Sequence, residues 1–234
     1  MRITNLQKQI EDFYLQIDDL HLEEHKVHGI VGGNGCGKST LAKLLMGIME
    51  PDQGVVDYQG LQPAEMTMTL QRPYLLHESV YENIIYPLKI RRIVPQEEEI
   101  DQWLKRYGLA DKKKRYARSL SSGERQKLSF IRAMIFEPKL VIIDETFSNL
   151  DPDTVTLMED WILQKQKETP ITYLIISHQI GQIFRLCDVV HVMDKGQIVE
   201  SGPCKEVLLY SENSAVQNYI KGHTIRMEAN QWNC

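Results

Sequence analysis

The sequence predicts an α/β fold, in which helices cover a mainly parallel β-sheet. Two observations predict it. In the second half of the chain, short apolar segments alternate with segments of helical periodicity, as they do in βαβ units. The expected strands are 140–143, 172–176 and 189–193, and the expected helices lie near 153–168 and 179–187. In the first half, a glycine-rich loop follows a short apolar segment and precedes a helical pattern.

The first sixty residues are expected to be rich in β-structure. Apolar side chains alternate with polar ones between Phe13 and Leu22, as they do in half-buried strands. Residues 27–31 form a short apolar segment that is typical of a buried strand. Residues 54–58 follow a Pro-Asp-Gln-Gly turn and form another candidate strand.

Residues 78–137 have helical periodicity instead. Apolar residues at helical spacing mark two helices, one around Ile100, Trp103, Leu104 and Tyr107 and one around Leu128, Ile131 and Ile135. A short helix is also expected in the tail from about residue 211, with Val216, Tyr219 and Ile220 on one face. The basic cluster at 112–115 is expected to lie in a solvated loop.

Composition limits the class of protein. The 234 residues suffice for one large α/β domain or two small ones, and the net charge of −5 argues against non-specific binding of nucleic acid. No apolar run approaches the roughly 18–20 residues of a membrane span, and the N-terminus lacks the apolar region of a signal peptide. The four cysteines form no C-x-x-C pair and no metal-ligand spacing, which favours reduced thiols in the cytoplasm.

Residues 32–40, GGNGCGKST, match the phosphate-binding loop pattern G-x-x-x-x-G-K-[ST]. A strand is expected before the loop, and a helix is expected after it from the spacing of Leu41, Leu44, Leu45 and Ile48. Backbone N–H groups and a helix N-terminus there favour a polyphosphate. We expect the nucleotide to contact Gly32, Gly33, Asn34, Gly35, Cys36, Gly37, Lys38, Ser39 and Thr40. Lys38 would reach the β- and γ-phosphates, and the Ser39 hydroxyl would bind Mg²⁺.

The surroundings of Cys36 favour a thiolate. Backbone N–H groups, a helix N-terminus and Lys38 all lie close to it in sequence, which predicts a lowered pKa and a reactive sulfur. The alternative is an inert small residue at a serine-like position.

Polar side chains follow two of the expected strands. Asp144 and Glu145 end the apolar segment that starts at Leu140, and adjacent strand residues point to opposite faces. Asp144 is therefore expected to reach Mg²⁺, and Glu145 is expected to act as general base on a water. His178 follows the strand at 172–176, at the edge where ligands bind in open α/β sheets.

The segment 120–126, Leu-Ser-Ser-Gly-Glu-Arg-Gln, resembles the signature L-S-G-G-Q of ABC-type ATPases. Further motifs of this family occur in the family's order between about residues 3 and 203. Gln71 matches the Q-loop glutamine, Asp144 and Glu145 match the Walker B aspartate and the catalytic glutamate, Ser148–Asp151 match the D-loop, and His178 matches the switch histidine.

The resemblance implies a fold and a set of site residues. It implies a P-loop NTPase core with an antiparallel β-subdomain (1–72 and 139–203), an inserted helical subdomain (73–138) and a helical tail (204–234). The implied catalytic residues are Glu145, His178 and Lys38. The implied ATP contacts outside the phosphate loop are Gln71, Ser121, Ser122, Gly123, Glu124 and Asp151, and the implied Mg²⁺ ligands are Ser39, Gln71 and Asp144.

The resemblance also implies partners. ATP would lie between the phosphate loop of one subunit and the signature of another, in a homodimer or in a heterodimer with a paralogous ATPase. The assembly would power multi-span permease subunits, together with a solute-binding protein. The chain would then be cytoplasmic, on the inner face of the membrane. The run from Val80 to Arg91 is similar to the tungstate, molybdate and phosphate importers, which makes an oxyanion one candidate solute.

Two other classes remain as alternatives. One is a soluble ABC ATPase that is not coupled to transport, although such proteins usually carry tandem nucleotide domains or coiled-coil insertions. The other is a P-loop kinase for small molecules, which would lack the signature and the switch histidine.

Several residues depart from the family pattern. Ser122 replaces a glycine, Glu124 replaces the usual glutamine, and Thr146 replaces the proline that commonly follows the catalytic glutamate. Ungapped spacing puts Gln9 where an aromatic residue usually stacks on adenine, and Phe13 or Tyr14 would need a shift in register.

The apolar segment after Gln71 is a candidate docking surface. Residues 73–77, with Tyr81 shortly after, are expected to contact the permease through Tyr74 and Leu76. The alternative is that Leu75 and Leu76 pack under the helical subdomain.

Overall fold

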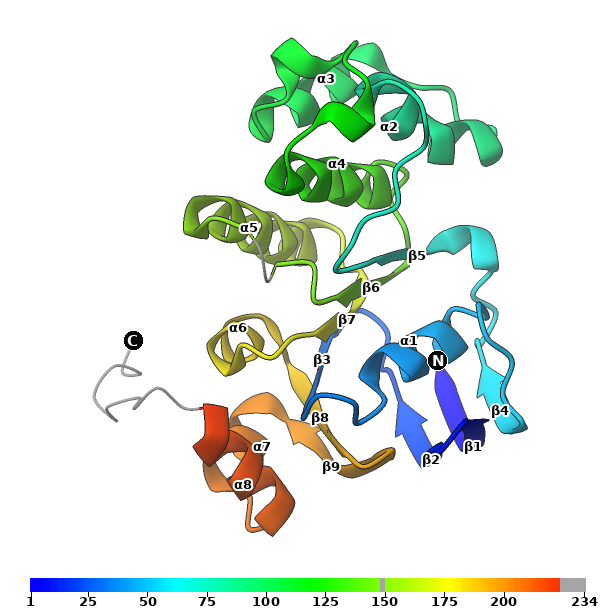
Figure 1. Cartoon of the computed structure of the whole chain (residues 1–234), viewed down its shortest axis with the longest axis vertical. Coiled ribbons are helices and arrows are strands. Elements are labelled where there is room, and N and C mark those ends of the chain that lie inside the picture. The colour runs from blue at the N-terminus through cyan, green and yellow to red at the C-terminus, as the bar shows by residue number, and fades with distance from the viewer. Residues whose placement is uncertain (148–149, 224–234) are drawn as a thin grey trace. The chain divides into compact units, whose positions relative to one another are not determined.

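The computed structural model describes residues 1–147 and 150–223, and the chain divides into two compact units. Unit 1 comprises Met1–Asp57 and Ile175–Cys234, and unit 2 comprises Tyr58–Leu174. Figure 1 labels the helices and strands of both units, which are described in turn.

Unit 1 contains a three-stranded antiparallel sheet of order β2-β1-β4. Its strands are β1 (Arg2–Ile10), β2 (Phe13–His21) and β4 (Gln53–Asp57). Leu15, Ile17 and Leu20 of β2 are buried, which confirms the predicted alternation. β1 was not predicted as a separate strand.

The other strands of unit 1 flank the phosphate loop. β3 (Val27–Gly32) pairs in parallel with β8 (Val189–Asp194), and β8 pairs antiparallel with β9 (Gln197–Pro203). The helices of the unit are α1 (Lys38–Leu45), α6 (Ile180–Leu186), α7 (Cys204–Tyr210) and α8 (Ser214–His223). The predictions of β3, β8, α6 and α8 are confirmed, whereas β9 and α7 were missed.

One residue of the predicted first helix lies outside it. α1 ends at Leu45, and Ile48 is 66% exposed rather than part of the apolar face. Gly47 has a φ of 65°, a left-handed conformation that ends a helix.

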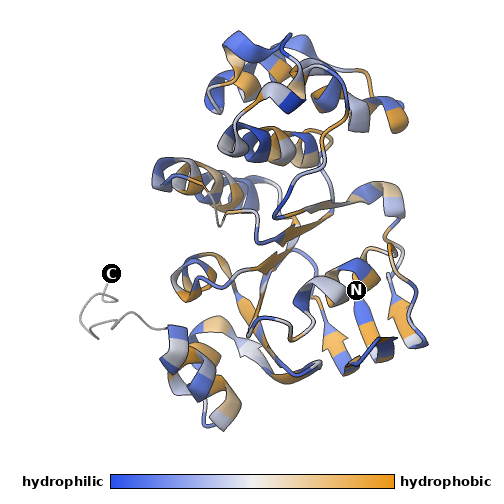
Figure 2. Ribbon diagram, in the orientation of Figure 1, coloured by the Kyte–Doolittle hydropathy of each residue, from blue (hydrophilic) through white to orange (hydrophobic). Residues whose placement is uncertain are grey.

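Unit 2 has a parallel sheet at its centre. β5 (Met66–Thr69) pairs in parallel with β6 (Leu140–Asp144), and β7 (Thr172–Ile176), whose last two residues belong to unit 1, follows β6 in the sheet. Every residue of β6 and β7 is buried, as their continuous apolar sequences predict. Figure 2 shows this hydrophobic character along the strands.

The described part of unit 2 also contains four α-helices. They are α2 (Val80–Ile90), α3 (Glu97–Arg106), α4 (Ser122–Met134) and α5 (Pro152–Glu168). Short 3₁₀ helices span Pro63–Glu65, Ala110–Lys112 and Ala117–Ser119. α2, α3 and α4 gather at one end of the unit (Figure 1) and fall within 73–138, where a helical subdomain stays a prediction.

An aromatic cluster joins three of these helices. The ring of Trp103 on α3 lies 5.9 Å from that of Tyr107 and 5.1 Å from that of Trp161 on α5, measured between centroids. Phe130 on α4 contacts both Tyr107, at 5.7 Å, and Trp161, at 5.6 Å. Such pairs stabilise a fold beyond the area they bury, so α4 has a fixed position within the unit.

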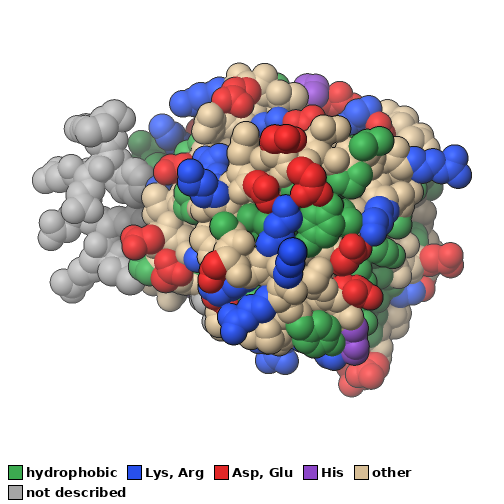
Figure 3. Space-filling view, turned by 90° about the horizontal axis from the view of Figure 1, so that it is seen from above, with side chains coloured by type: hydrophobic (Ala, Val, Ile, Leu, Met, Phe, Trp, Pro, Cys, Tyr) green, Lys and Arg blue, Asp and Glu red, His purple; other side chains and the backbone are tan. Residues whose placement is uncertain are grey.

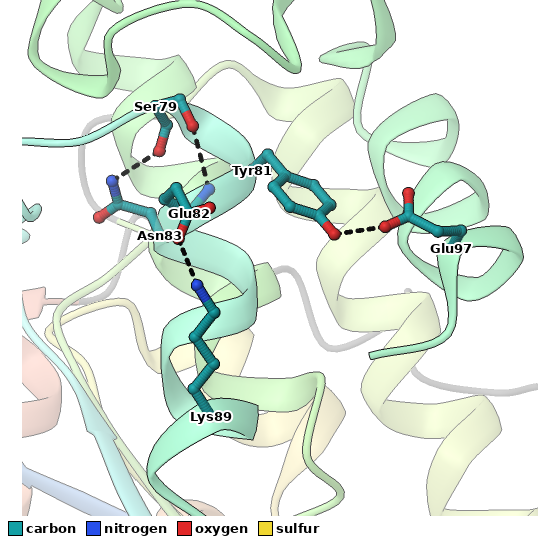
Figure 4. A network of polar contacts seen from close by, with 6 residues as sticks. All are labelled: Ser79, Tyr81, Glu82, Asn83, Lys89 and Glu97. Carbon is teal, nitrogen blue, oxygen red and sulfur yellow. Dashed lines mark hydrogen bonds and ion pairs between the residues drawn. The ribbon is translucent and has the colours of Figure 1, made fainter. Parts of the chain in front are cut away.

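The start of α2 is held by its own polar side chains (Figure 4). Ser79 caps the helix, because its Oγ accepts the Glu82 N–H at 3.1 Å. The buried Asn83 donates from Nδ2 to the Ser79 carbonyl at 2.9 Å, and its Oδ1 accepts the Leu76 N–H at 2.9 Å. The chain before α2 is therefore anchored to the helix.

The basic cluster is not simply solvated. The Lys112 ammonium lies 2.7 Å from Glu124, and the Lys113 ammonium lies 2.8 Å from Glu97 and 2.7 Å from Asp101. Lys114 and Arg115 are exposed, as predicted, and Lys112 and Lys113 are half-buried at the surface, because acidic side chains distant in sequence pair with them. Among the residues that the structure describes, no helix combines the length and apolar character needed to cross a bilayer.

Candidate functional site

The phosphate loop of unit 1 runs from the end of β3 to the start of α1. Lys38 is the first residue of α1 and is only 5% exposed. Its Nζ donates to the carbonyl oxygens of Gly32 at 2.8 Å and Gly33 at 2.9 Å. The ammonium group is thus held over the loop, at the N-terminus of a helix.

At two positions of this loop, neighbouring atoms leave no room for a side chain, so glycine is required. A Cβ on Gly32 would lie 2.1 Å from the Met193 carbonyl oxygen. Gly37 has a φ of 109°, and a Cβ there would lie 2.8 Å from the Phe13 ring. Only glycine fits either position without movement of the backbone or of a packed ring.

The prediction for Cys36 is wrong. Burial raises the pKa of its thiol, although the nearby Lys38 ammonium opposes this effect. The side chain is 5% exposed, with Sγ 3.8 Å from the Lys38 Nζ. Desolvation disfavours the thiolate more than the loop favours it, so the structure supports the alternative of an inert small residue.

The sequence predicted that Asp144 and Glu145 are adjacent residues of one strand. In the structure only Asp144 belongs to that strand. β6 ends at Asp144, which is 6% exposed. Glu145 follows the strand with a φ of 48°, in the left-handed region that non-glycine residues rarely adopt. Such a conformation costs of order 1–3 kcal/mol and is often found at functional sites. The side chain of Glu145 accepts a hydrogen bond at 3.2 Å from Nε2 of Gln71.

The side chain of Gln126 on α4 contacts the backbone of the two segments that carry Gln71 and Glu145. Its side chain is buried, and Nε2 donates to the carbonyl oxygens of Gln71 at 2.9 Å and Thr146 at 3.1 Å. The same amide lies 3.4 Å from the Leu70 carbonyl oxygen. Sequence reasoning included Gln126 in the signature segment but gave it no role. Only its polar character at a buried helix position hinted at one.

The signature residues lie at the start of α4. Ser121 caps the helix, because its Oγ accepts the Glu124 N–H at 3.3 Å. The Ser121 N–H in turn donates to the Glu124 carboxylate at 2.9 Å, which completes a capping box. Lys112 and the Ser121 N–H hold the pKa of Glu124 down at about 2. Gly123 is not required by packing here, because a Cβ would lie at an ordinary 3.8 Å from Leu150.

Asp151 caps α5. Its carboxylate accepts from the Thr154 N–H at 2.9 Å and from the Thr154 hydroxyl at 2.8 Å, and these bonds lower its pKa. The rest of the predicted D-loop contains Ser148 and Asn149, which lie outside the described residues.

His178 follows β7 and belongs to unit 1. Its ring stacks with that of His223 of α8, with 6.4 Å between centroids and 15° between ring planes. No motif or spacing in the sequence indicated this neighbour.

The predicted site residues therefore fall into two groups. Unit 1 carries the phosphate loop and His178, and unit 2 carries Gln71, the carboxylates, the signature and Asp151. Within unit 2, direct contacts join Gln71 to Glu145 and Ser121 to Glu124.

Known proteins resemble this chain along most of its length. The family model described as "ABC transporter" matches residues 15–148. The tungstate uptake system ATP-binding protein TupC of Peptoclostridium acidaminophilum is 32% identical over 206 residues, which cover 85% of this chain and 96% of that protein. The methionine import ATP-binding protein MetN 2 of Bacillus anthracis is 31% identical over 217 residues. The match covers 86% of this chain but only 64% of that longer protein.

Solved structures agree. A structure titled "Structure of ATP binding subunit of ABC transporter" matches with a TM-score of 0.78 and 23% identity over 88% of this chain and 90% of that one, which shows the fold. CbiO1 from Clostridium perfringens, described as part of the ABC transporter complex cbiONQ, matches with a TM-score of 0.72 and 28% identity over 88% of this chain and 89% of that one. The chain therefore belongs to the ABC transporter family, and it is an ABC-type ATPase.

Proposed function

We propose that the chain hydrolyses MgATP to power a separate membrane permease that imports a small solute. The similarity to TupC over 96% of that protein's length supports this function, and it makes an oxyanion the first solute class to test. The observation that carries the chemistry is the hydrogen bond between Gln71 and Glu145. It holds a general base beside a polar amide at the end of a buried strand.

Glu145 would accept a proton from the attacking water. The Gln71 amide donates to one carboxylate oxygen and thereby orients the group. The left-handed backbone of Glu145 fixes the direction of its side chain further. Lys38, which is buried at the start of α1, would balance the charge of the β- and γ-phosphates.

The residues proposed for Mg²⁺ fit that ion. Ser39, Asp144 and the Gln71 side-chain carbonyl are all oxygen ligands, which Mg²⁺ prefers. The described residues contain no cluster of three or more His, Cys, Asp or Glu suited to a metal. Mg²⁺ is usually bound through one or two carboxylates, with phosphates and waters completing its shell, and Asp144 would supply one such carboxylate. When bound, Mg²⁺ would neutralise charge that develops on the phosphate oxygens.

Tyr14 is our candidate for the nucleobase contact. Gln9 and Tyr14 are directly opposite in the β1–β2 pair, so their side chains share a face of the sheet. Tyr14 is 44% exposed, whereas the neighbouring Phe13 lies against Gly37. An aromatic ring from β2 would thus replace the one that β1 lacks. Tyr14→Ala should weaken ATP binding and Tyr14→Phe should not; equal binding by both variants would reject the assignment.

The second partner in the site would be another copy of the chain, or a paralogous ATPase. Ser121, Ser122 and Gly123 at the N-terminus of α4 would then contact the nucleotide held by the other subunit, because a helix N-terminus favours an anion. ATP would hold the two subunits together, and hydrolysis would release them.

The permease is proposed to dock at Tyr74. This side chain is 68% exposed, yet its carbonyl oxygen accepts a 2.7 Å hydrogen bond from Nη2 of Arg132. Leu75 is buried, which supports the alternative reading for that residue, and Leu76 is half-buried. An exposed aromatic ring on an anchored backbone is a typical interface anchor.

The surroundings of Tyr74 suggest the chemistry of the partner. Tyr74 lines a groove of about 580 Å³ together with Arg72, Arg118 and Arg125. Figure 3, which views the α2–α3 end of the chain, shows hydrophobic side chains exposed among charged ones. A permease loop that combines apolar and acidic residues would fit the groove.

The experiment is reconstitution. The chain would be co-expressed with candidate permease subunits and a solute-binding protein, and solute uptake into vesicles would be measured with and without ATP inside. The proposal places the chain on the inner face of the membrane, so ATP inside right-side-out vesicles should be required. ATP hydrolysis without any permease association or uptake would favour a soluble ABC ATPase instead.

A further inference from the structure

The signature helix α4 carries a carboxylate in its first turn. Glu124 stands where the family usually has glutamine, in the first turn of α4 and three residues after Ser121. The proposed function brings a nucleotide phosphate to this helix N-terminus. Two negative charges close together in a partly desolvated interface repel each other, so an uncompensated Glu124 would oppose ATP binding.

The structure supplies a compensating charge. Nζ of Lys112 lies 2.7 Å from Oε1 of Glu124, while Oε2 accepts the Ser121 N–H at 2.9 Å. Both oxygens of the carboxylate are therefore occupied by donors. The side chains of the pair are only 20% and 25% exposed, so solvent screens this contact less than it screens an open surface pair.

Glu124 is the principal partner of Lys112. The carboxylate of Asp111 is farther from Nζ, at 4.0 Å, and is 77% exposed. Glu124 raises the pKa of Lys112, so the ammonium stays charged, although Arg115 nearby acts in the opposite direction. Lys112 ends the 3₁₀ helix Ala110–Lys112, so its side chain links α4 to a segment that precedes it in unit 2.

We propose that Lys112 is a positioning residue of this signature. Its ammonium cancels the charge of Glu124 and holds the carboxylate against the Ser121 N–H, which leaves the helix N-terminus able to accept a nucleotide phosphate. The proposal rests on the proposed function. It gives Lys112, one residue of the basic cluster at 112–115, a role in the ATPase and explains how the chain tolerates a glutamate at this position.

The test is a double-mutant cycle on the ATPase. Lys112→Met removes the charge and keeps the aliphatic stem. It should lower kcat/KM for MgATP about tenfold, mainly by raising KM, because the freed carboxylate repels the phosphate. In a Glu124→Gln background, the same Lys112→Met change should alter kcat/KM less than about twofold. Lys113→Met is the matched control, because Lys113 pairs with Glu97 and Asp101 instead, and it should leave the activity unchanged.

The results of this cycle distinguish a charge effect of Lys112 from a packing effect. Equal losses from Lys112→Met in both backgrounds would show that Lys112 acts through packing and would overturn the proposal, as would no loss in the parent background. Thermal unfolding of each variant identifies a loss that arises from folding. Failure of the parent protein to hydrolyse ATP would instead contradict the proposed function. Binding of MgATP by the Glu145→Gln variant, with and without Lys112→Met, would then still test the charge effect.

Discussion

The hydroxyl groups of Thr69 and Thr146 lie 2.6 Å apart, and both side chains are buried. Thr69 ends β5, two residues before Gln71, and Thr146 directly follows Glu145. One hydrogen bond therefore joins the segment that carries Gln71 to the segment that carries Glu145. It also gives a reason for a threonine where related proteins commonly have proline, because proline has no hydroxyl group to make this bond.

Replacing one threonine of this pair by valine should lower the free energy of unfolding more than replacing both. Thr146→Val leaves the Thr69 hydroxyl buried without its partner, so we expect a loss of about 1–3 kcal/mol in the free energy of unfolding. The Thr69→Val/Thr146→Val double variant should recover part of this loss, because neither side chain then has an unsatisfied group. Urea unfolding measures both effects. Additive losses in the double variant would show that the hydroxyls do not interact.

Glu145→Gln should abolish hydrolysis but keep ATP binding. A glutamine preserves the shape of the side chain and removes the base, a change typically worth about 10²–10⁴ in rate. The ATP-bound dimer should then accumulate, which size exclusion with and without ATP would show. Lys38→Ala should instead lose binding, because it removes the ammonium group held over the loop. Hydrolysis by Glu145→Gln at the parent rate would refute the role of this residue.

Two inactive variants should complement each other if the site is shared between subunits. Lys38→Ala damages the phosphate loop, and Ser121→Arg blocks the start of α4. A mixture contains heterodimers with one intact Lys38–Ser121 site, so part of the ATPase activity should return. Each variant alone at twice the concentration is the control. Full activity of Ser121→Arg alone would contradict the shared site.

The sequence predicted the strand β3, the glycine-rich loop and the helix that follows it because the requirement there is local. Gly32 and Gly37 are set by backbone space and conformation, which the motif records. The apolar runs of β6 and β7 were equally clear, because strands buried on both faces need no alternation.

The predictions failed where contacts between residues distant in sequence determine the local structure or the pKa. In β1 the buried residues Ile3 and Leu6 are three apart, because the register shifts between Thr4 and Gln7 where Asn5 has a φ of 50°. That bulge hides the period-two pattern of a strand. The thiol of Cys36 was misjudged because charged neighbours are visible in a sequence and burial is not.

A pair of buried histidines predicts how stability depends on pH. Nδ1 of His28 and Nε2 of His191 lie 3.1 Å apart, and both side chains are buried. His28 Nε2 must donate to the Glu23 carbonyl oxygen at 3.1 Å, since a carbonyl only accepts. Its Nδ1 therefore accepts from His191, whose own Nδ1 accepts the Ser201 hydroxyl at 2.8 Å. Two neutral rings satisfy every ring nitrogen, and a second proton on His28 would bring two N–H donors face to face between the rings.

Burial lowers the pKa of both histidines, to about 3 for His191, although Glu23 and Asp188 partly oppose the shift of His28. The unfolded chain binds these protons near pH 6.5, so this contribution to stability is complete above that pH. It is lost as the pH falls below 6.5, by up to about 1.4 kcal/mol per pH unit for each histidine, and for His191 the loss continues towards pH 3. Urea midpoints at pH 7.5 and 5.5 measure the loss. A His28→Asn/His191→Gln variant with the same pH dependence as the parent would contradict this origin.

Tyr74→Asp should separate ATP hydrolysis from transport. The exposed ring contributes little to the fold of unit 2, because only its backbone carbonyl is held, by Arg132. An aspartate removes the apolar anchor and places a negative charge among Arg72, Arg118 and Arg125 of the same groove, where it would compete with an acidic partner. We expect near-parental basal ATPase activity, with loss of co-purification with the permease and loss of uptake.

Tyr210→Asp is the matched control, because Tyr210 on α7 is 76% exposed and lies in unit 1. Leu76→Asp is less informative, since that side chain is half-buried and its loss affects folding as well. Normal uptake with Tyr74→Asp would place the docking surface elsewhere on the chain.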